Sequence, residues 1–92
     1  MDEIIFEWNE EKNILLSKER NISFEDVVFA LKNNKLLDII LSPTHEGQKC
    51  FVVDINAYAY VIPYVSVHAT KLFLKTIFPS RKHTKIFLKG KA

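Results

Sequence analysis

The apolar positions in the first part of the chain follow the spacing of a strand and then that of a helix. In the opening stretch DEIIFEW, the apolar side chains Ile4, Phe6 and Trp8 fall on one face, as in a short strand. Asn9 can then cap a helix with two glutamates in its first turn, where the helix dipole favours acids. This first helix is expected over residues 10–20.

A second helical pattern follows in the stretch NISFEDVVFALKNN. Ser23 is a good N-cap, with Asp26 at the third helical position, where a capping box usually has Glu or Gln. An apolar stripe with the spacing i, i+3, i+4, i+7 is formed by Phe24, Val27, Val28 and Leu31. The pattern predicts a helix that packs this stripe on a core and ends at residues 33–34.

The apolar period then changes to two. The predicted strands are residues 35–41, 50–55, 58–67 and 72–78. Four antiparallel strands after a short N-terminal strand and two helices predict an α+β fold, with these elements packed on a four-stranded antiparallel sheet. A short C-terminal helix is also expected over residues 81–89, ended by Gly90.

The strand at residues 58–67 has two different faces. One face is small and aliphatic, with Ala59, Val61, Val65 and Val67. The other face is mostly aromatic, with Tyr58, Tyr60, Ile62 and Tyr64. The small face is expected to pack against the helices, and the tyrosine face is either a second covered surface or a stacking platform. Pro63 cannot donate to a sheet ladder, so a bulge or an edge position is expected there.

Length and cysteine content limit the class of protein. The 92 residues, 48% hydrophobic and 26% charged, predict one folded domain over residues 1–92. A chain of this size buries only roughly 60–65% of its unfolded surface, so a partner or a second copy would stabilise it as a hetero- or homo-oligomer. The single Cys50 permits no internal disulfide and is expected to be buried. The sequence shows neither a leader nor an apolar run of ~20 residues, so we expect a cytoplasmic protein without membrane contact.

The charged residues are distributed unevenly along the chain. Residues 1–54 hold 6 Lys or Arg and 11 Asp or Glu, a balance of −5, whereas residues 55–92 hold 7 Lys or Arg and no acid, a balance of +7. This asymmetry is typical of either a solvated basic face or a surface that binds a polyanion, and the complete absence of acids favours the second. The residues expected to form one basic face are Lys75, Arg81, Lys82 and Lys85.

Three motifs, in this order and spacing, resemble the BrnT family of small bacterial toxins. They are FEWNEEKN near the start, ISFEDVVFAL in the middle and KTIFPSRKHTK near the end. The resemblance covers most of the chain, and the three motifs together are much more specific than any one alone. It implies a RelE-like ribonuclease fold and a toxin that cleaves RNA to stop translation. It also implies a DNA-binding antitoxin partner, with promoter DNA bound only through the toxin–antitoxin complex.

Two segments depart from the family pattern. Family members usually carry Lys-His-Gly ahead of the second motif, where this chain has Glu19, Arg20 and Asn21. The shorter SARK of the family is replaced by FPSRK before the C-terminal helix. Both changes are compatible with the fold, but the first leaves the identity of the catalytic group open.

The candidate site residues come mainly from the basic C-terminal segment. A metal-independent ribonuclease must assist attack by the 2′-hydroxyl, stabilise charge on the phosphorus oxygens and assist the leaving 5′-oxygen. The catalytic candidates are Arg81 and Lys82, which match the RK of the family motif, together with Lys75 on the last strand and the imidazole His83. The further RNA-binding candidates are Lys71, Lys85, Tyr60 and Tyr64.

Other chemistries find less support in the sequence. The histidines at positions 45, 68 and 83 lack metal-ligand spacing, and two glycines allow no Gly-rich phosphate loop, so neither a metal nor a cofactor is expected. No sequence neighbour marks Ser80 as a triad nucleophile. The leading interpretation is a ribonuclease toxin whose partners are RNA and a cognate antitoxin. The alternative is a non-catalytic module whose basic face holds nucleic acid or an acidic partner, and a third interpretation makes that face only a docking surface.

Overall fold

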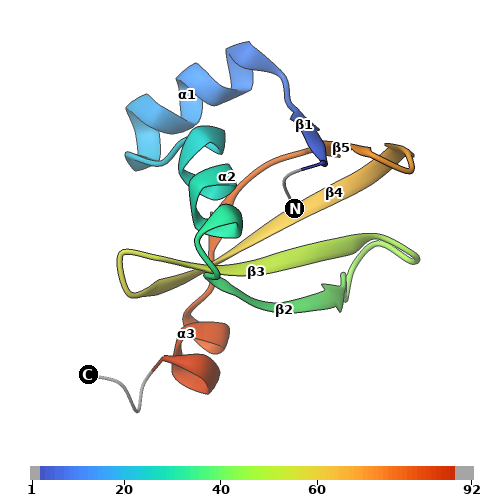
Figure 1. Ribbon diagram of the computed structural model, residues 1–92. Helices are drawn as coiled ribbons and strands as arrows, with labels where there is room; N and C mark the ends of the chain where they lie inside the picture. Colours follow the sequence, from blue (N-terminus) through green and yellow to red (C-terminus); the bar gives the residue numbers. More distant parts are fainter. Residues whose placement is uncertain (1–2, 89–92) are drawn as a thin grey trace.

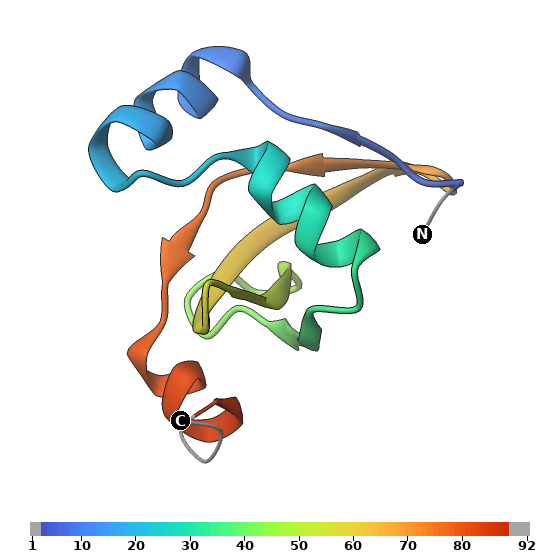
Figure 2. The ribbon, with the colours of Figure 1, turned by 60° about the vertical axis from the view of Figure 1, so that its left-hand side comes forward.

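The computed structural model describes residues 3–88 as three helices and a mixed β-sheet (Figure 1). The elements in chain order are β1 (Ile5–Glu7), α1 (Glu10–Arg20), α2 (Phe24–Lys32), β2 (Leu36–Leu41), β3 (Lys49–Ile55), β4 (Tyr58–His68), β5 (Lys71–Leu74), β6 (Phe78–Pro79) and α3 (Arg81–Phe87). Helices α1 and α2 cover one face of the sheet, and α3 lies against the other (Figure 2). The predicted α+β class is confirmed. The helix end expected at Gly90 lies outside the described residues.

The sheet contains more strands than the four expected from the sequence. Its order is β1-β5-β4-β3-β2, and β6 pairs with β4 beyond the end of β5. The N-terminal strand β1 joins the sheet at its edge, parallel to β5, with Phe6 opposite Leu72. The predicted last strand is divided into β5 and β6, because the chain leaves the ladder after Leu74. Lys75 was therefore wrongly placed on a strand, since it lies in the connection between the two.

Pro63 lies where β4 changes its partner from β5 to β6. On the other side of β4, the pairing with β3 is unbroken and places Cys50 opposite Pro63, so the expected irregularity occurs only on the side of β4 that faces β5 and β6. The Pro63 carbonyl accepts the Lys75 N–H at 2.8 Å. The N–H and C=O of one strand residue point to the same side, so the donor that proline lacks would point into the gap between β5 and β6. An interior strand can therefore hold this proline at little cost.

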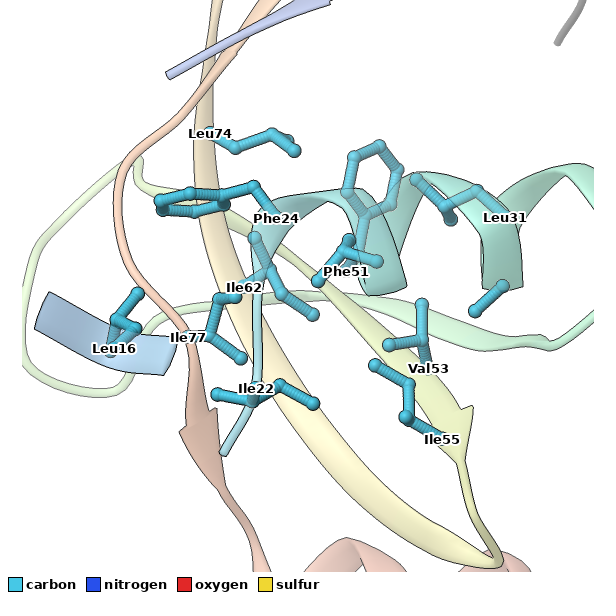
Figure 3. Close-up of a cluster of buried hydrophobic side chains, with 12 residues drawn as sticks. Leu16, Ile22, Phe24, Leu31, Phe51, Val53, Ile55, Ile62, Leu74 and Ile77 are labelled. Carbon is cyan, nitrogen blue, oxygen red and sulfur yellow. The ribbon is translucent and has the colours of Figure 1, made fainter. Parts of the chain in front are cut away.

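The larger hydrophobic cluster lies between the sheet and helices α1 and α2 (Figure 3). Members that are 0% exposed include Phe24, Val27, Ile62, Leu74 and Ile77. Complete burial of such a side chain contributes about 1.5–3 kcal/mol relative to exposure. Trp8, which follows β1, stacks on Phe24 with ring centroids 5.6 Å apart. This contact ties the N-terminal strand to the cluster.

A smaller cluster on the opposite face of the sheet packs against α3. Its buried members are Cys50, Val52, Ala59, Val61 and Leu88. The small face of β4 therefore meets α3, whereas the tyrosine face packs on the larger cluster, which corrects our expectation for the first two helices. The short Ala59 side chain lets α3 approach closely, and the Ala59 N–H donates to Thr84 Oγ1 at 2.8 Å.

The ends of the first two helices form as the sequence predicts. Asn9 Oδ1 accepts the Lys12 N–H at 3.0 Å, and Ser23 forms a reciprocal capping box with Asp26 before α2. Asn21 ends α1 in the left-handed region, with φ 54°. Asparagine tolerates this region better than most residues, so it can replace the glycine of the family's Lys-His-Gly with little backbone strain.

Candidate functional site

The first turn of α3 is held against β4 by hydrogen bonds. Ser80 caps the helix: its Oγ accepts the His83 N–H at 3.2 Å, and its own N–H donates to the Ala59 carbonyl at 2.9 Å. The Thr84 hydroxyl donates to the Ser80 carbonyl at 2.8 Å and accepts the Ala59 N–H. These bonds fix the direction in which the first turn presents its side chains.

The first turn of α3 carries positive charge. Arg81 and Lys82 occupy it and no acidic residue does, whereas α1 and α2 each begin with two acidic residues. A helix dipole favours anions at its N-terminus by about 0.3–1 kcal/mol, so cations there oppose helix formation by a similar amount. Arg81, Lys82 and Lys85 are all exposed. The charges of Arg81 and Lys82 therefore do not stabilise the helix that carries them, whereas Lys85 lies in the last turn, where a cation is favoured.

His83 is paired with the capping serine. Its Nδ1 lies 2.6 Å from Ser80 Oγ, and its ring lies parallel to that of Phe87, with centroids 6.4 Å apart. No partner for Ser80 was expected from the sequence, and the structure supplies one three residues later in the same turn. Within residues 3–88 no carboxylate hydrogen-bonds to His83, so the pair lacks the third group of a triad. The bond orients the imidazole and leaves Nε2 as its free ring nitrogen.

Lys75 is positioned by the loop between β2 and β3. Its Nζ donates to Gln48 Oε1 at 3.1 Å. The Gln48 amide is itself fixed, because its Nε2 donates to the Tyr64 carbonyl at 2.6 Å and to the Lys49 carbonyl at 2.8 Å. The exposed ammonium group is thus held by a neutral acceptor.

Three of the RNA-binding candidates lie apart from α3. Lys71 is in an ion pair with Glu7, 3.4 Å from Nζ to Oε2, near the β4–β5 turn at the far end of the sheet (Figure 1). Tyr60 and Tyr64 lie on the opposite face, half-buried against the larger cluster. Tyr64 stacks on Phe51 with centroids 4.0 Å apart, and burial raises the pKa of its hydroxyl. The structure therefore brings Arg81, Lys82, His83 and Lys85 together on α3 without these three.

Arg20 is a cation that the sequence analysis did not assign to the site. Its guanidinium reaches from the end of α1 and donates to the Ile77 carbonyl at 2.8 Å. This contact lies on the segment that leads into α3, four residues before Arg81. The sequence did contain a signal for it, because Arg20 aligns with the histidine of the family's Lys-His-Gly.

The basic side chains of this region are free of carboxylates. Among residues 3–88 no acid pairs with Lys75, Arg81, Lys82 or Lys85, so the expected basic segment is not neutralised within the fold. No group of three or more His, Cys, Asp and Glu in the described chain is arranged to hold a metal ion. Cys50 is buried, which raises the pKa of its thiol. The positive charge that this region presents to a ligand therefore comes from its lysine and arginine side chains.

The crystal structure of a bacterial toxin shares this architecture. The crystal structure of the Brucella abortus ribonuclease toxin BrnT matches this chain with a TM-score of 0.62, over 84% of this chain and 96% of BrnT, at 15% sequence identity. The chain has a BrnT-like fold. The resemblance predicted from the three sequence motifs is confirmed at the level of the fold.

The relation to BrnT is visible in the structure rather than in the overall sequence. No protein-family model and no curated protein sequence matches the chain. No helix of residues 3–88 is long and apolar enough to span a membrane.

Proposed function

We propose that this protein is a ribonuclease toxin of a bacterial toxin–antitoxin pair, with residues 1–92 as its single BrnT-like toxin domain. It acts in the cytoplasm, cleaves RNA to inhibit translation and is neutralised by a cognate antitoxin. The observation that carries the proposal is a BrnT-like fold whose last helix presents Arg81 and Lys82 without a carboxylate partner among residues 3–88. Cations that oppose their own helix dipole are best explained by an anionic ligand.

The proposed reaction needs no metal, because protein cations can stabilise the phosphate. The RNA 2′-oxygen attacks the adjacent phosphorus and forms a new P–O bond, while the bond to the 5′-oxygen breaks. The 2′-hydroxyl proton passes to a base, and a proton is delivered to the leaving 5′-oxygen. Arg81 and Lys82 stabilise charge on the phosphorus oxygens, where one oriented donor is worth ~10²–10³ in rate. His83, oriented by Ser80, offers Nε2 for proton transfer.

The proposed partners follow from the same interpretation. RNA binds the basic segment, with Lys75 and Lys85 as further contacts. The antitoxin is a DNA-binding protein, and promoter DNA is bound only through the toxin–antitoxin complex. An exposed cationic helix suits both RNA and an acidic segment of an antitoxin, so neutralisation can occur by direct competition.

The test is RNA cleavage by the purified protein and by Arg81→Ala, together with growth arrest on induced expression. We expect Arg81→Ala to lower cleavage by about 10²–10³-fold while circular dichroism stays unchanged, because Arg81 is exposed. Lys32→Ala, an exposed lysine at the end of α2, is the matched control and should cleave normally. Unchanged cleavage by folded Arg81→Ala would remove this site assignment.

Salt dependence gives an independent measure of the RNA contacts. If about four cations touch phosphates of single-stranded RNA, the log–log slope of affinity against salt should be near −3, from roughly −0.7 per contact. Arg81→Ala should flatten this slope by about 0.7. An affinity that does not change with salt would indicate an apolar protein interface instead.

A non-catalytic binding module is the second candidate, and one observation favours it. Arg20 stands where the family carries a histidine, and an arginine does not exchange protons near neutral pH. If the unmodified protein binds RNA with the predicted salt slope but cleaves none, this second candidate replaces the ribonuclease.

A further inference from the structure

A small polar cleft lies outside α3, between the β2–β3 loop and the connection from β5 to β6. Its volume is about 280 Å³. The side chains that define its chemistry are Ser42, Thr44, His45, Gln48, Lys75 and Phe78. None of the residues that line it is acidic. The cleft therefore offers hydroxyls, an amide, an imidazole and one ammonium group beside an aromatic ring.

The ammonium group of the cleft is held in place. Gln48 uses its amide Nε2 on two main-chain carbonyls and its Oε1 on Lys75 Nζ, at 3.1 Å. A lysine ammonium has three donors, and this contact uses one of them. The remaining donors are available to an anion, and no carboxylate of residues 3–88 competes for them.

The opposite side of the cleft is a loop ordered by its own hydrogen bonds. Ser42 Oγ accepts the N–H groups of Thr44 and His45, at 3.3 and 3.2 Å. Thr44 Oγ1 lies 3.0 Å from His45 Nδ1. The hydroxyls and the imidazole are thereby held across the cleft from Lys75. Such groups hydrogen-bond to phosphate and ribose oxygens.

The third element of the cleft is apolar. Phe78 is 40% exposed and lies on β6, with Pro63 close by in the wall of the cleft. An exposed ring beside a fixed cation suits a nucleobase, because every base has a face that stacks. Phe78 also precedes Arg81 by three residues, an extended span of about 10 Å. A chain of nucleotides leaving the cleft can thus continue to the first turn of α3.

We propose that this cleft is a nucleotide subsite for single-stranded RNA, in which Lys75 binds a phosphate and Phe78 stacks on the neighbouring base. The inference rests on the proposed function for the identity of the ligand, but it concerns binding and not cleavage. An acidic peptide would use the ammonium group and leave the aromatic wall without a role. Phe78 also belongs to the segment FPSRK, where this chain departs from the family pattern.

The test measures binding of a six-nucleotide oligouridine to the full chain. Phe78→Ala should weaken binding by about 5- to 150-fold, the equivalent of a stacking loss of about 1–3 kcal/mol. Phe29→Ala, an aromatic 70% exposed on α2, is the matched control and should bind as the unmodified protein does. Phe78→Trp should retain affinity and show fluorescence quenching on binding, beyond any quenching from Trp8, because a larger ring still stacks.

The phosphate contact is tested with Lys75→Ala. This variant should bind less tightly and flatten the salt slope by about 0.7, with Lys32→Ala as its control. Circular dichroism establishes that each variant is folded. If Phe78→Ala and Lys75→Ala bind like their controls while Arg81→Ala binds weakly, the subsite is wrong and the proposed function survives. If both lose affinity but the unmodified protein cuts no RNA, the subsite stands and the ribonuclease proposal fails.

Discussion

The two faces of the sheet bury different amounts of apolar surface. Between the sheet and helices α1 and α2, the described chain buries a cluster of 12 side chains, whereas the face under α3 buries 5 (Figure 3). The helices on the first face begin with acids and the helix on the second begins with cations. The first face therefore contributes more to the stability of the fold than the second. This division lets α3 carry an unfavourable charge without unfolding the domain.

The largest predicted effect comes from emptying the larger cluster. Phe24→Ala removes a ring that is 0% exposed and stacks on Trp8, and should lower the free energy of unfolding by about 3–5 kcal/mol. Leu88→Ala, in the smaller cluster, should cost less, because α3 can detach while the rest stays folded. Urea denaturation compares the two variants. If Leu88→Ala is as destabilising as Phe24→Ala, the two faces form one cooperative unit.

Asn13 supplies the next largest effect, on the stable face. Its buried side chain accepts the Phe24 N–H at 2.7 Å through Oδ1 and donates to Glu25 Oε1 at 2.7 Å through Nδ2. Asn13→Leu leaves a buried N–H unpaired and should cost about 1–3 kcal/mol in denaturant unfolding.

The pH dependence of stability tests the same contact. The hydrogen bond from Asn13, followed by a main-chain bond, lowers the pKa of Glu25 below the ordinary value of a glutamate. A lowered folded pKa means that the unfolded chain binds more protons near that pH, so this contribution is full above about 4.5 and disappears as the pH falls through the folded pKa. In Asn13→Leu the acid-induced loss of stability should be smaller than in the unmodified protein. An identical profile would show that the Asn13–Glu25 hydrogen bond does not contribute to the pH dependence of stability.

The smallest effect tests the charge on α3. Lys82→Glu replaces a cation with an anion in the first turn and should stabilise α3 by about 0.3–1 kcal/mol through the helix dipole. If Lys82 binds a phosphate as we propose, the same change should weaken RNA binding, because it removes this contact and adds repulsion. Amide hydrogen exchange in α3 and oligouridine affinity should therefore move in opposite directions. Lys82→Gln provides the neutral control for each measurement.

Local sequence patterns predicted most of the secondary structure. The Asn9 cap, the Ser23–Asp26 capping box and the start of α3 at Arg81 depend on contacts within one turn. The alternation of β3 and β4 likewise depends on neighbours, because side chains of a strand change face at every residue. The basic character of the C-terminal segment, and the candidate residues Arg81, Lys82 and Lys85, could be read in the same way.

Contacts between distant segments could not be read from such patterns. The parallel pairing of β1 with β5 joins the two ends of the chain, and no local signal distinguishes it from a separate strand. Both faces of β4 are apolar, so the sequence does not show which face packs against α3 and which packs against α1 and α2. The ladder breaks beside Pro63, whose carbonyl accepts the Lys75 N–H but which has no N–H of its own to donate.

The sequence by itself determined the elements, their caps and the concentration of positive charge at one end, since each arises from residues within a few positions of one another. Only the tertiary structure decided which side chains share a site. It placed Arg20 on the Ile77 carbonyl, Lys75 on Gln48 and Phe78 beside both the cleft and α3. These contacts join residues up to 57 positions apart, and they form only when the sheet and its two helical layers bury their apolar faces together.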